Sequence, residues 1–197
     1  ISGQNVATSY HHLIQLDAFK YIPYFEKLDM QNLIIDEPMQ FDVWIAILNA
    51  KMNNEEPLSK LKISNKEQSH IKHLVSIINQ LPEVNSKSDL TMMVYDYDIN
   101  DILTIIKHTP TLSKNHIKTA SPLIINQQTI KDSYQQLPIN QRQQLAINGN
   151  DLMQHLNQQG GPWVKDVLRK VEVAVVTNKV SNTYNEIMKW VDSHVKI

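Results

Sequence analysis

Apolar residues recur at intervals of three and four positions along most of the chain, the spacing of one buried face of an amphipathic α-helix. The pattern is lost over residues 111–122, which we expect to form a loop or a frayed helix, and residues 83–88 are expected to form a polar loop. The predicted fold class is therefore all-α, an elongated multi-helix array without a substantial sheet. Helices are predicted over residues 6–19, 38–52, 64–81, 98–107, 126–137, 151–159, 162–178 and 182–195.

Helix starts and buried faces carry recognisable local signals. Ser64 and Glu67 match the S-x-x-E capping box, in which each side chain satisfies a backbone N–H at the start of a helix. Trp44 lies on an apolar stripe and is expected in the core, and Pro82 stops the helix that begins after Ser64. The predicted buried faces are Val6, Tyr10, Leu13 and Ile14; Phe41, Trp44, Ile45, Leu48 and Met52; and Ile71, Leu74, Val75 and Ile78.

The densest group of turn signals lies in the stretch INGNDLMQHLNQQGGPWVKDVL, which begins at residue 147. Asn148 and Asn150 are good caps for a helix that begins near Asp151, whose carboxylate suits the positive end of the helix dipole. Gly160 and Gly161 are expected to end this helix in the left-handed conformation, and the proline that follows is suited to start the next one. The stretch therefore predicts a compact helix-turn-helix.

The second helix of this motif separates apolar from basic residues. Lys165, Arg169 and Lys170 lie largely off its apolar face, and Arg142 precedes the motif in a QRQQ run after Pro138, which resembles a hinge. This hinge divides the chain into a predicted helical domain of residues 1–137 and a second one of residues 138–197. The apolar face consists of Val164, Val167, Leu168, Val171 and Val175.

Composition narrows the class of protein. Of 197 residues, 42% are hydrophobic, which is enough for a proper core, and the absence of cysteine excludes disulfides and cysteine-ligated metals. No apolar run approaches the roughly 20 residues that span a bilayer, and the start lacks the features of a signal peptide, so we expect a cytoplasmic protein without a membrane partner. The first residue is Ile rather than Met, which suggests a piece of a longer protein.

The turn motif resembles a known family. Bacterial class II CCA-adding enzymes, which are tRNA nucleotidyltransferases, have tails with an I-x-G-x-D-L-M segment, a short helix and a glycine-proline turn. The likeness is strongest over about the last third of the chain, and it departs at Lys165, where many members have glycine. The residues that carry it are Ile147, Gly149, Asp151, Leu152, Met153, Gly160, Gly161, Pro162, Trp163, Val164 and Leu168.

The resemblance implies a function and a domain plan. Residues 1–137 would be the helical body with the end of the neck at its start, and residues 138–197 the tail. Together they would hold tRNA by its backbone while an absent N-terminal head, with magnesium, CTP and ATP, adds CCA. The family would allow a homodimer of the intact enzyme. The alternatives are a poly(A) polymerase of the same superfamily and a helical protein-interaction module without an RNA role.

Catalytic and metal-binding signals are weak in these residues. Asp96 and Asp98 have the D-x-D spacing of a two-magnesium polymerase site, but no phosphate-binding loop or strand-rich region accompanies them. The pairs His11–His12 and His70–His73 lack further ligands in the sequence, and the second pair lies among lysines. We therefore expect no catalytic residue, no metal and no cofactor in this part, and no nucleotide addition by it alone.

The RNA-binding prediction rests on the turn and the basic residues. A helix N-terminus at the glycine pair offers backbone N–H groups to a phosphate, and lysine and arginine side chains can add ionic contacts. A net charge of −1 gives no overall attraction to nucleic acid, so charge alone favours an ordinary solvated surface. Another interpretation is a tight turn with Trp163 in the core. The predicted RNA-binding residues are Arg142, Gly160, Gly161, Lys165, Arg169 and Lys170.

Overall fold

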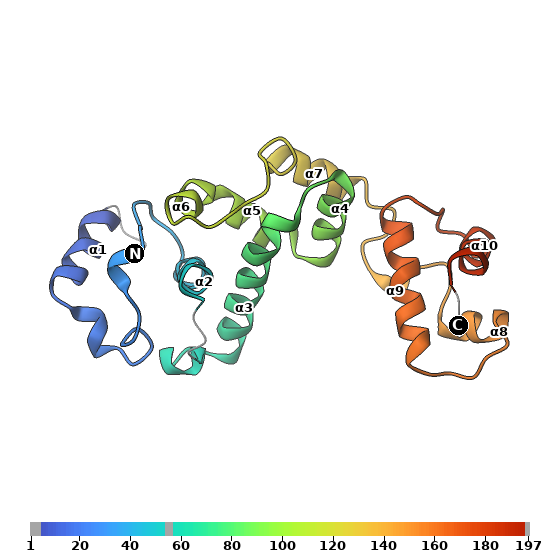
Figure 1. The fold of residues 1–197 in the computed structure, drawn as a ribbon, viewed down its shortest axis with the longest axis horizontal. Helices are drawn as coiled ribbons and strands as arrows, with labels where there is room; N and C mark the ends of the chain where they lie inside the picture. Colours follow the sequence, from blue (N-terminus) through green and yellow to red (C-terminus); the bar gives the residue numbers. More distant parts are fainter. Residues whose placement is uncertain (1–4, 54–56, 196–197) are drawn as a thin grey trace. The chain divides into compact units, whose positions relative to one another are not determined.

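The computed structural model describes residues 5–53 and 57–195, and in these residues the regular structure is helical throughout, with no strand. Figure 1 shows α-helices joined by short turns and 3-10 segments. The all-α prediction is confirmed. The physical reason is that apolar residues recur at the helical period and form the buried faces of the helices. None of the described helices is both long enough and apolar enough to cross a membrane.

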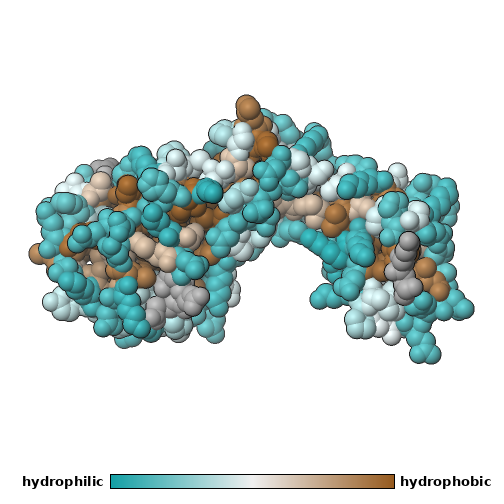
Figure 2. All heavy atoms as spheres, in the orientation of Figure 1, coloured by the Kyte–Doolittle hydropathy of each residue, from teal (hydrophilic) through white to brown (hydrophobic). Residues whose placement is uncertain are grey.

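The chain divides into two compact units. Unit 1 consists of residues Ile1–Asn85 and Ile99–Gln127, and unit 2 consists of residues Ser86–Asp98 and Gln128–Ile197. The boundary predicted between residues 137 and 138 falls inside unit 2, since two further segments group with the C-terminal residues. On the face drawn in Figure 2, hydrophilic side chains cover most of each unit.

Unit 1 is built around α2, which is buried on all sides. Each residue from Val43 to Leu48 is buried, and α2 packs against α3, which in turn packs against α5. Trp44 is 4% exposed, as predicted, but Phe41 is 46% exposed, so the predicted stripe was wrong at its first residue. The helices of unit 1 are α1 (Val6–Gln15), η1 (Ala18–Tyr21), η2 (Met30–Asn32), α2 (Phe41–Met52), η3 (Leu58–Leu61), α3 (Asn65–Gln80), η4 (Leu81–Glu83), α5 (Ile99–Lys107) and α6 (Thr109–Lys114).

Local signals fixed some helix ends and missed others. The capping box at the start of α3 is confirmed, since the Glu67 N–H donates to Ser64 Oγ at 3.2 Å and the Ser64 N–H donates to Glu67 Oε2 at 2.8 Å. The first helix ends at Gln15 rather than at residue 19, because Asp17 adopts a left-handed conformation with φ 52°. The expected loop after residue 110 begins as α6, whose first turn contains Pro110 instead of ending there.

Unit 2 packs its helices on both sides of a valine-rich helix, α9. Helices α4, α8 and α10 all contact α9. Its core consists of Ile139, Leu145, Ile147, Leu152, Val167, Val171, Val175, Val176, Ile187, Met188 and Val191. The helices of this unit are α4 (Lys87–Asp96), α7 (Gln127–Gln135, whose first residue belongs to unit 1), η5 (Arg142–Gln144), α8 (Gly149–His155), α9 (Pro162–Val176) and α10 (Tyr184–His194).

Helix α4 was missed in the sequence. Residues 83–88 were predicted as a loop, but α4 already begins at Lys87, with Ser86 as its N-cap accepting a hydrogen bond from the Asp89 N–H at 3.2 Å. The signal was a serine cap followed three residues later by an acidic residue, with Leu90, Met93 and Val94 buried at helical spacing. The polar first turn of α4 was therefore assigned to the preceding loop, although the residues after it have a regular amphipathic pattern.

Helix α8 ends at a different residue from the one predicted. Asn148 caps α8, whose start at Gly149 lies close to the expected one, and Asp151 completes a capping box. The glycine pair does not supply a left-handed residue, since no glycine in the described part of the chain has a positive φ. Asn157, with φ 49°, takes that role, and Gly161 is the extended N-cap of α9 with φ −171°.

Candidate nucleic-acid interface

A buried carboxylate lies in α9 among the valines of unit 2. Glu172 is 3% exposed, although the residues around it on the helix form the core of the unit. An ionised carboxylate loses its hydration when it is buried, so it is stable there only with charged or hydrogen-bonding partners. The side chains around Glu172 therefore decide what this part of α9 can do.

Three side chains satisfy this carboxylate. Arg142 binds it through two nitrogens, with Nη2 at 2.6 Å from Oε2 and Nε at 3.2 Å from Oε1. Arg169 Nη1 donates to Oε2 at 3.1 Å, and the Tyr95 hydroxyl donates to Oε1 at 2.5 Å. Burial alone would raise the pKa of Glu172, but these hydrogen bonds outweigh it, so its pKa lies below the ordinary value.

A second carboxylate completes this group. Arg169 Nη2 also donates to Asp96 Oδ2 at 2.7 Å, so its guanidinium lies between two acidic side chains. We call Tyr95, Asp96, Arg142, Arg169 and Glu172 the arginine cluster. Two arginines face two carboxylates, so their charges balance, yet each arginine side chain remains 42% exposed. Both arginines were predicted to bind phosphate, and the structure shows them joined to helices α4 and α9 of the same unit.

The two predicted lysines differ from the arginines. Lys165 and Lys170 are both exposed on α9, and neither forms an ion pair with any of the described residues. Residues 165 and 169 are one helical turn apart, so Lys165 follows the same side of α9 as Arg169. The lysines therefore offer ammonium groups outside any ion pair on the helix that also carries Arg169 and Glu172.

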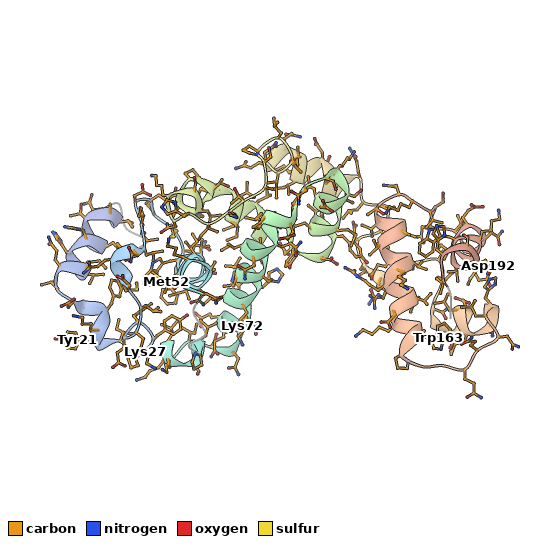
Figure 3. All side chains as sticks on the ribbon, in the orientation of Figure 1. Tyr21, Lys27, Met52, Lys72, Trp163 and Asp192 are labelled. Atoms are coloured by element: carbon orange, nitrogen blue, oxygen red, sulfur yellow. The ribbon has the colours of Figure 1, made fainter. Side chains whose placement is uncertain are left out.

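The predicted glycine turn is exposed at the start of α9. Gly160 and Gly161 are both exposed, and Trp163 follows them half-buried against the core of unit 2. Figure 3 labels Trp163 at the start of this helix, and its Nε1 donates to the Gln159 carbonyl oxygen at 2.9 Å. The indole thus stabilises the turn, while the glycines leave its backbone accessible.

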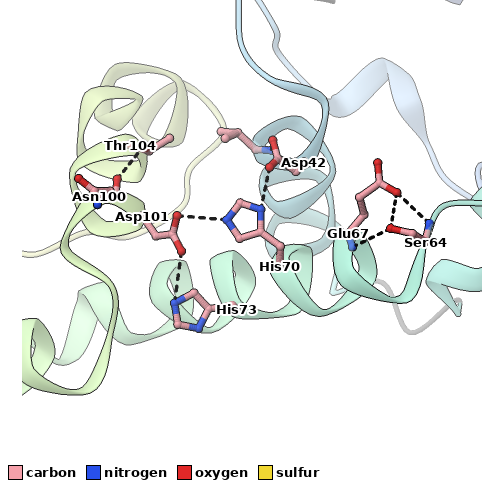
Figure 4. Close-up of polar contacts among 9 residues, drawn as sticks. Asp42, Ser64, Glu67, His70, His73, Asn100, Asp101 and Thr104 are labelled. Carbon is pink, nitrogen blue, oxygen red and sulfur yellow. Dashed lines mark hydrogen bonds and ion pairs between the residues drawn. The ribbon is translucent and has the colours of Figure 1, made fainter. Parts of the chain in front are cut away.

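The histidine pair of α3 lies in a setting that the sequence did not reveal. Figure 4 shows His70 between two carboxylates, with Nδ1 at 2.8 Å from Asp42 Oδ2 and Nε2 at 3.1 Å from Asp101 Oδ1. His73 Nε2 lies 3.5 Å from Asp101 Oδ2. Burial alone would lower the pKa of His70, but the two aspartates raise it above its ordinary value. The lysines near this pair, Lys66 and Lys72, are exposed as expected, but the sequence did not reveal the two aspartates that contact His70.

The other residues considered for catalysis or metal binding do not form a site in the described part of the chain. Asp96 is the last residue of α4, and its D-x-D partner Asp98 follows that helix rather than lying on a strand. Within the described ranges, no group of three or more His, Asp or Glu side chains is placed to hold a metal ion. His11 and His12 are exposed on α1.

Two residues of the arginine cluster were missed in the sequence. Glu172 was not singled out, although it is an isolated acidic residue within the run VEVAVV and lies three positions after Arg169. Tyr95 belongs to α4, which was itself missed, and it is separated from Glu172 by 77 positions. A charged residue inside a valine-rich helical face was the available signal, because such a position requires a partner.

Comparisons with known proteins agree with the resemblance seen in the turn motif. A family model described as tRNA nucleotidyltransferase domain 2, putative, matches residues 40–191. CCA-adding enzymes of Staphylococcus epidermidis (strain ATCC 12228 / FDA PCI 1200) and Staphylococcus haemolyticus (strain JCSC1435) are each 46% identical over 197 residues, which is 100% of this chain and 49% of each relative. The chain thus spans about half the length of the curated relatives it matches.

A solved structure supports the fold. The crystal structure of the Bacillus stearothermophilus CCA-adding enzyme in complex with CTP matches with a TM-score of 0.60 at 21% identity, over 78% of this chain and 38% of that one. At this identity the match concerns the arrangement of helices. The family model covers more than half of the chain, and the chain therefore belongs to the family of tRNA nucleotidyltransferase domain 2.

Proposed function

We propose that this chain holds tRNA by its sugar-phosphate backbone and is part of an enzyme that adds CCA to the 3′ end. The names of relatives that are 46% identical over the whole chain support the enzyme class. The observation that supports RNA binding is that α9 carries exposed Lys165 and Lys170 together with half-exposed Arg169, and that half-exposed Arg142 binds to Glu172 of the same helix.

The lysines and the arginines would contribute differently to phosphate binding. Lys165 and Lys170 form no ion pair with any described residue, although the exposed Asp166 lies near both on α9, so their ammonium groups are available to a phosphate. The arginines already bind carboxylates, so their contribution is a guanidinium held in one orientation. Gly160 and Gly161 add an accessible backbone at the start of the same helix. Contacts of this kind recognise the shape of RNA rather than its sequence.

The remaining functions belong to the longer protein in this proposal. Its other half would bind magnesium, CTP and ATP and carry out nucleotidyl transfer, while residues 1–137 form a body and residues 138–197 a tail. This chain alone would add no nucleotide to a tRNA that lacks CCA. The intact enzyme would act in the cytoplasm, and a homodimer is the oligomer that we propose to test.

Salt-dependent binding tests the proposal. Fluorescence anisotropy with labelled tRNA would give the dissociation constant at several salt concentrations for the wild type and for the double variant Lys165→Ala/Lys170→Ala. Affinity falls with salt, so the slope of log affinity against log salt is negative, and each lost phosphate contact should make it less steep by about 0.7–0.9. The matched control is Lys66→Ala/Lys72→Ala, which removes two exposed lysines from α3.

The outcomes separate the competing interpretations. A less steep slope in the α9 variant alone supports backbone binding by this helix. Equal slopes in the wild type and both variants would remove Lys165 and Lys170 from the interface, and absence of any tRNA affinity would favour a protein-interaction module. In the full-length enzyme, addition of a long adenosine tail rather than CCA would identify a poly(A) polymerase.

A further inference from the structure

A hollow lies beside the arginine cluster in unit 2. Its volume is about 340 Å³, near the lower end of the roughly 300–1,000 Å³ typical of small-molecule sites. It is formed where the chain after η5 runs past the start of α8 and the middle of α9. Among the residues that line it are Arg142, Leu145, Ala146, Ile147, Gly149 and Leu168.

The walls of the hollow are fixed by the core. Leu145 and Ile147 are 8% and 5% exposed, and both belong to the core of unit 2, against which half-buried Leu168 also packs. Gly149 brings the start of α8 against α9, because a Cβ atom at this position would lie only 3.0 Å from Val164 Cγ1. The apolar wall is therefore rigid, and a flat apolar group can bind to it without rearrangement.

The polar edge is equally fixed. Arg142 lines the hollow, and Glu172 holds its Nε and Nη2 atoms, while Nη1 forms no hydrogen bond with any described residue. Lys165 lies three positions before Leu168 on α9, so these two side chains are neighbours on the helix surface. A positive edge beside an apolar wall complements a nucleotide, which joins a flat base to an anionic phosphate.

We infer that this hollow binds one base of an RNA at a position where that base is unpaired and turned out of its helix. The inference rests on the proposed tRNA binding and adds a base contact to it. The base packs against Leu145, Ile147 and Leu168, and the adjoining phosphate is bound by Arg142 and Lys165. Base contacts between proteins and RNA are made mainly at such unstacked bases, because the base edges in the deep, narrow major groove of an RNA helix are inaccessible.

A single thiol in the hollow tests this inference. The chain has no cysteine, so an Ala146→Cys variant carries one thiol, at an exposed position whose backbone N–H already donates to Asn182 Oδ1. Folded tRNA should slow alkylation of this thiol by maleimide at least tenfold, whereas a fully paired RNA duplex should leave the rate unchanged. The matched control is Ala7→Cys, at an exposed position of α1.

Alkylation also fills the hollow after the protein has folded. The modified Ala146→Cys protein should bind tRNA about 5- to 100-fold more weakly, the range expected for the loss of one base contact, and should bind the duplex as before. Unchanged tRNA affinity after complete alkylation would overturn the inference, and so would equal protection by tRNA and duplex. Absence of tRNA binding by the unmodified wild type would instead overturn the proposed function itself.

Discussion

The two units each join separate helices through a polar cluster, but the clusters differ in their chemistry. In unit 1, His70 of α3 lies between Asp42 of α2 and Asp101 of α5. In unit 2, Arg142 and Arg169 surround the buried Glu172. An imidazole changes its charge near neutral pH, whereas a guanidinium keeps its charge at every physiological pH. Only the cluster of unit 1 should therefore respond to pH near neutrality, while the charges of the cluster in unit 2 balance and stay fixed until the acidic range.

The largest expected effect concerns the core of unit 1. Trp44→Ala should lower the free energy of unfolding by about 3–5 kcal/mol, because the ring is buried against Phe19 and Phe25. Chemical denaturation followed by circular dichroism measures this value. Trp44→Phe is the control and should cost less, since the buried indole Nε1 has no hydrogen-bond partner among the described residues. Equal losses in both variants would contradict this account.

The next effect concerns the arginine cluster. Breaking a fully buried ion pair costs roughly 3–5 kcal/mol, and we expect about 2–3 kcal/mol for Glu172→Gln because both arginines can regain water. Urea unfolding of unit 2 would report the change. Tyr95→Phe removes one hydrogen bond to the same carboxylate and should cost only about 1 kcal/mol. An unchanged free energy of unfolding in Glu172→Gln would show that the arginines do not need this partner.

A smaller effect distinguishes the clusters by their pH dependence. The pKa of His70 is raised in the folded protein, so its stabilising contribution is complete below the unfolded pKa of about 6.5 and is lost as the pH rises through the folded value. The thermal midpoint of the wild type should therefore fall more than that of His70→Gln between about pH 6 and pH 8. The pKa of Glu172 is lowered, so its contribution is lost only when the pH falls into the acidic range. Parallel profiles of the two proteins would refute the role given to His70.

The smallest effect is expected from chelation. EDTA should leave the melting temperature unchanged, because no group of three acidic or histidine side chains in residues 5–53 and 57–195 is placed to hold a metal ion. Differential scanning fluorimetry with and without added zinc provides the measurement. A midpoint that falls with EDTA and recovers with zinc would show that His70, His73 and Asp101 bind a metal, which their hydrogen-bonded arrangement does not predict.

Much of the candidate site could be read from the sequence as single residues, but not as an arrangement. The basic residues of α9 were identified by their position off the apolar face, and Lys165 and Lys170 are indeed exposed. Arg169 was placed with them, although it is half-buried between Glu172 and Asp96. Helical periodicity gives the direction of a side chain relative to its own helix, and it cannot tell which other helix approaches that side.

The sequence by itself determined the all-α class, most helix positions, the caps at Ser64 and Asn148, and the turn motif that identified the family. These features depend on contacts within a few residues, where spacing and side-chain chemistry are sufficient. Only the tertiary structure decided that Tyr95 and Glu172, 77 positions apart, share a hydrogen bond, and that a hollow opens beside Arg142. The physical reason is that ion pairs and hollows require several segments to pack together, and the cost of burying Glu172 is offset only once those segments meet.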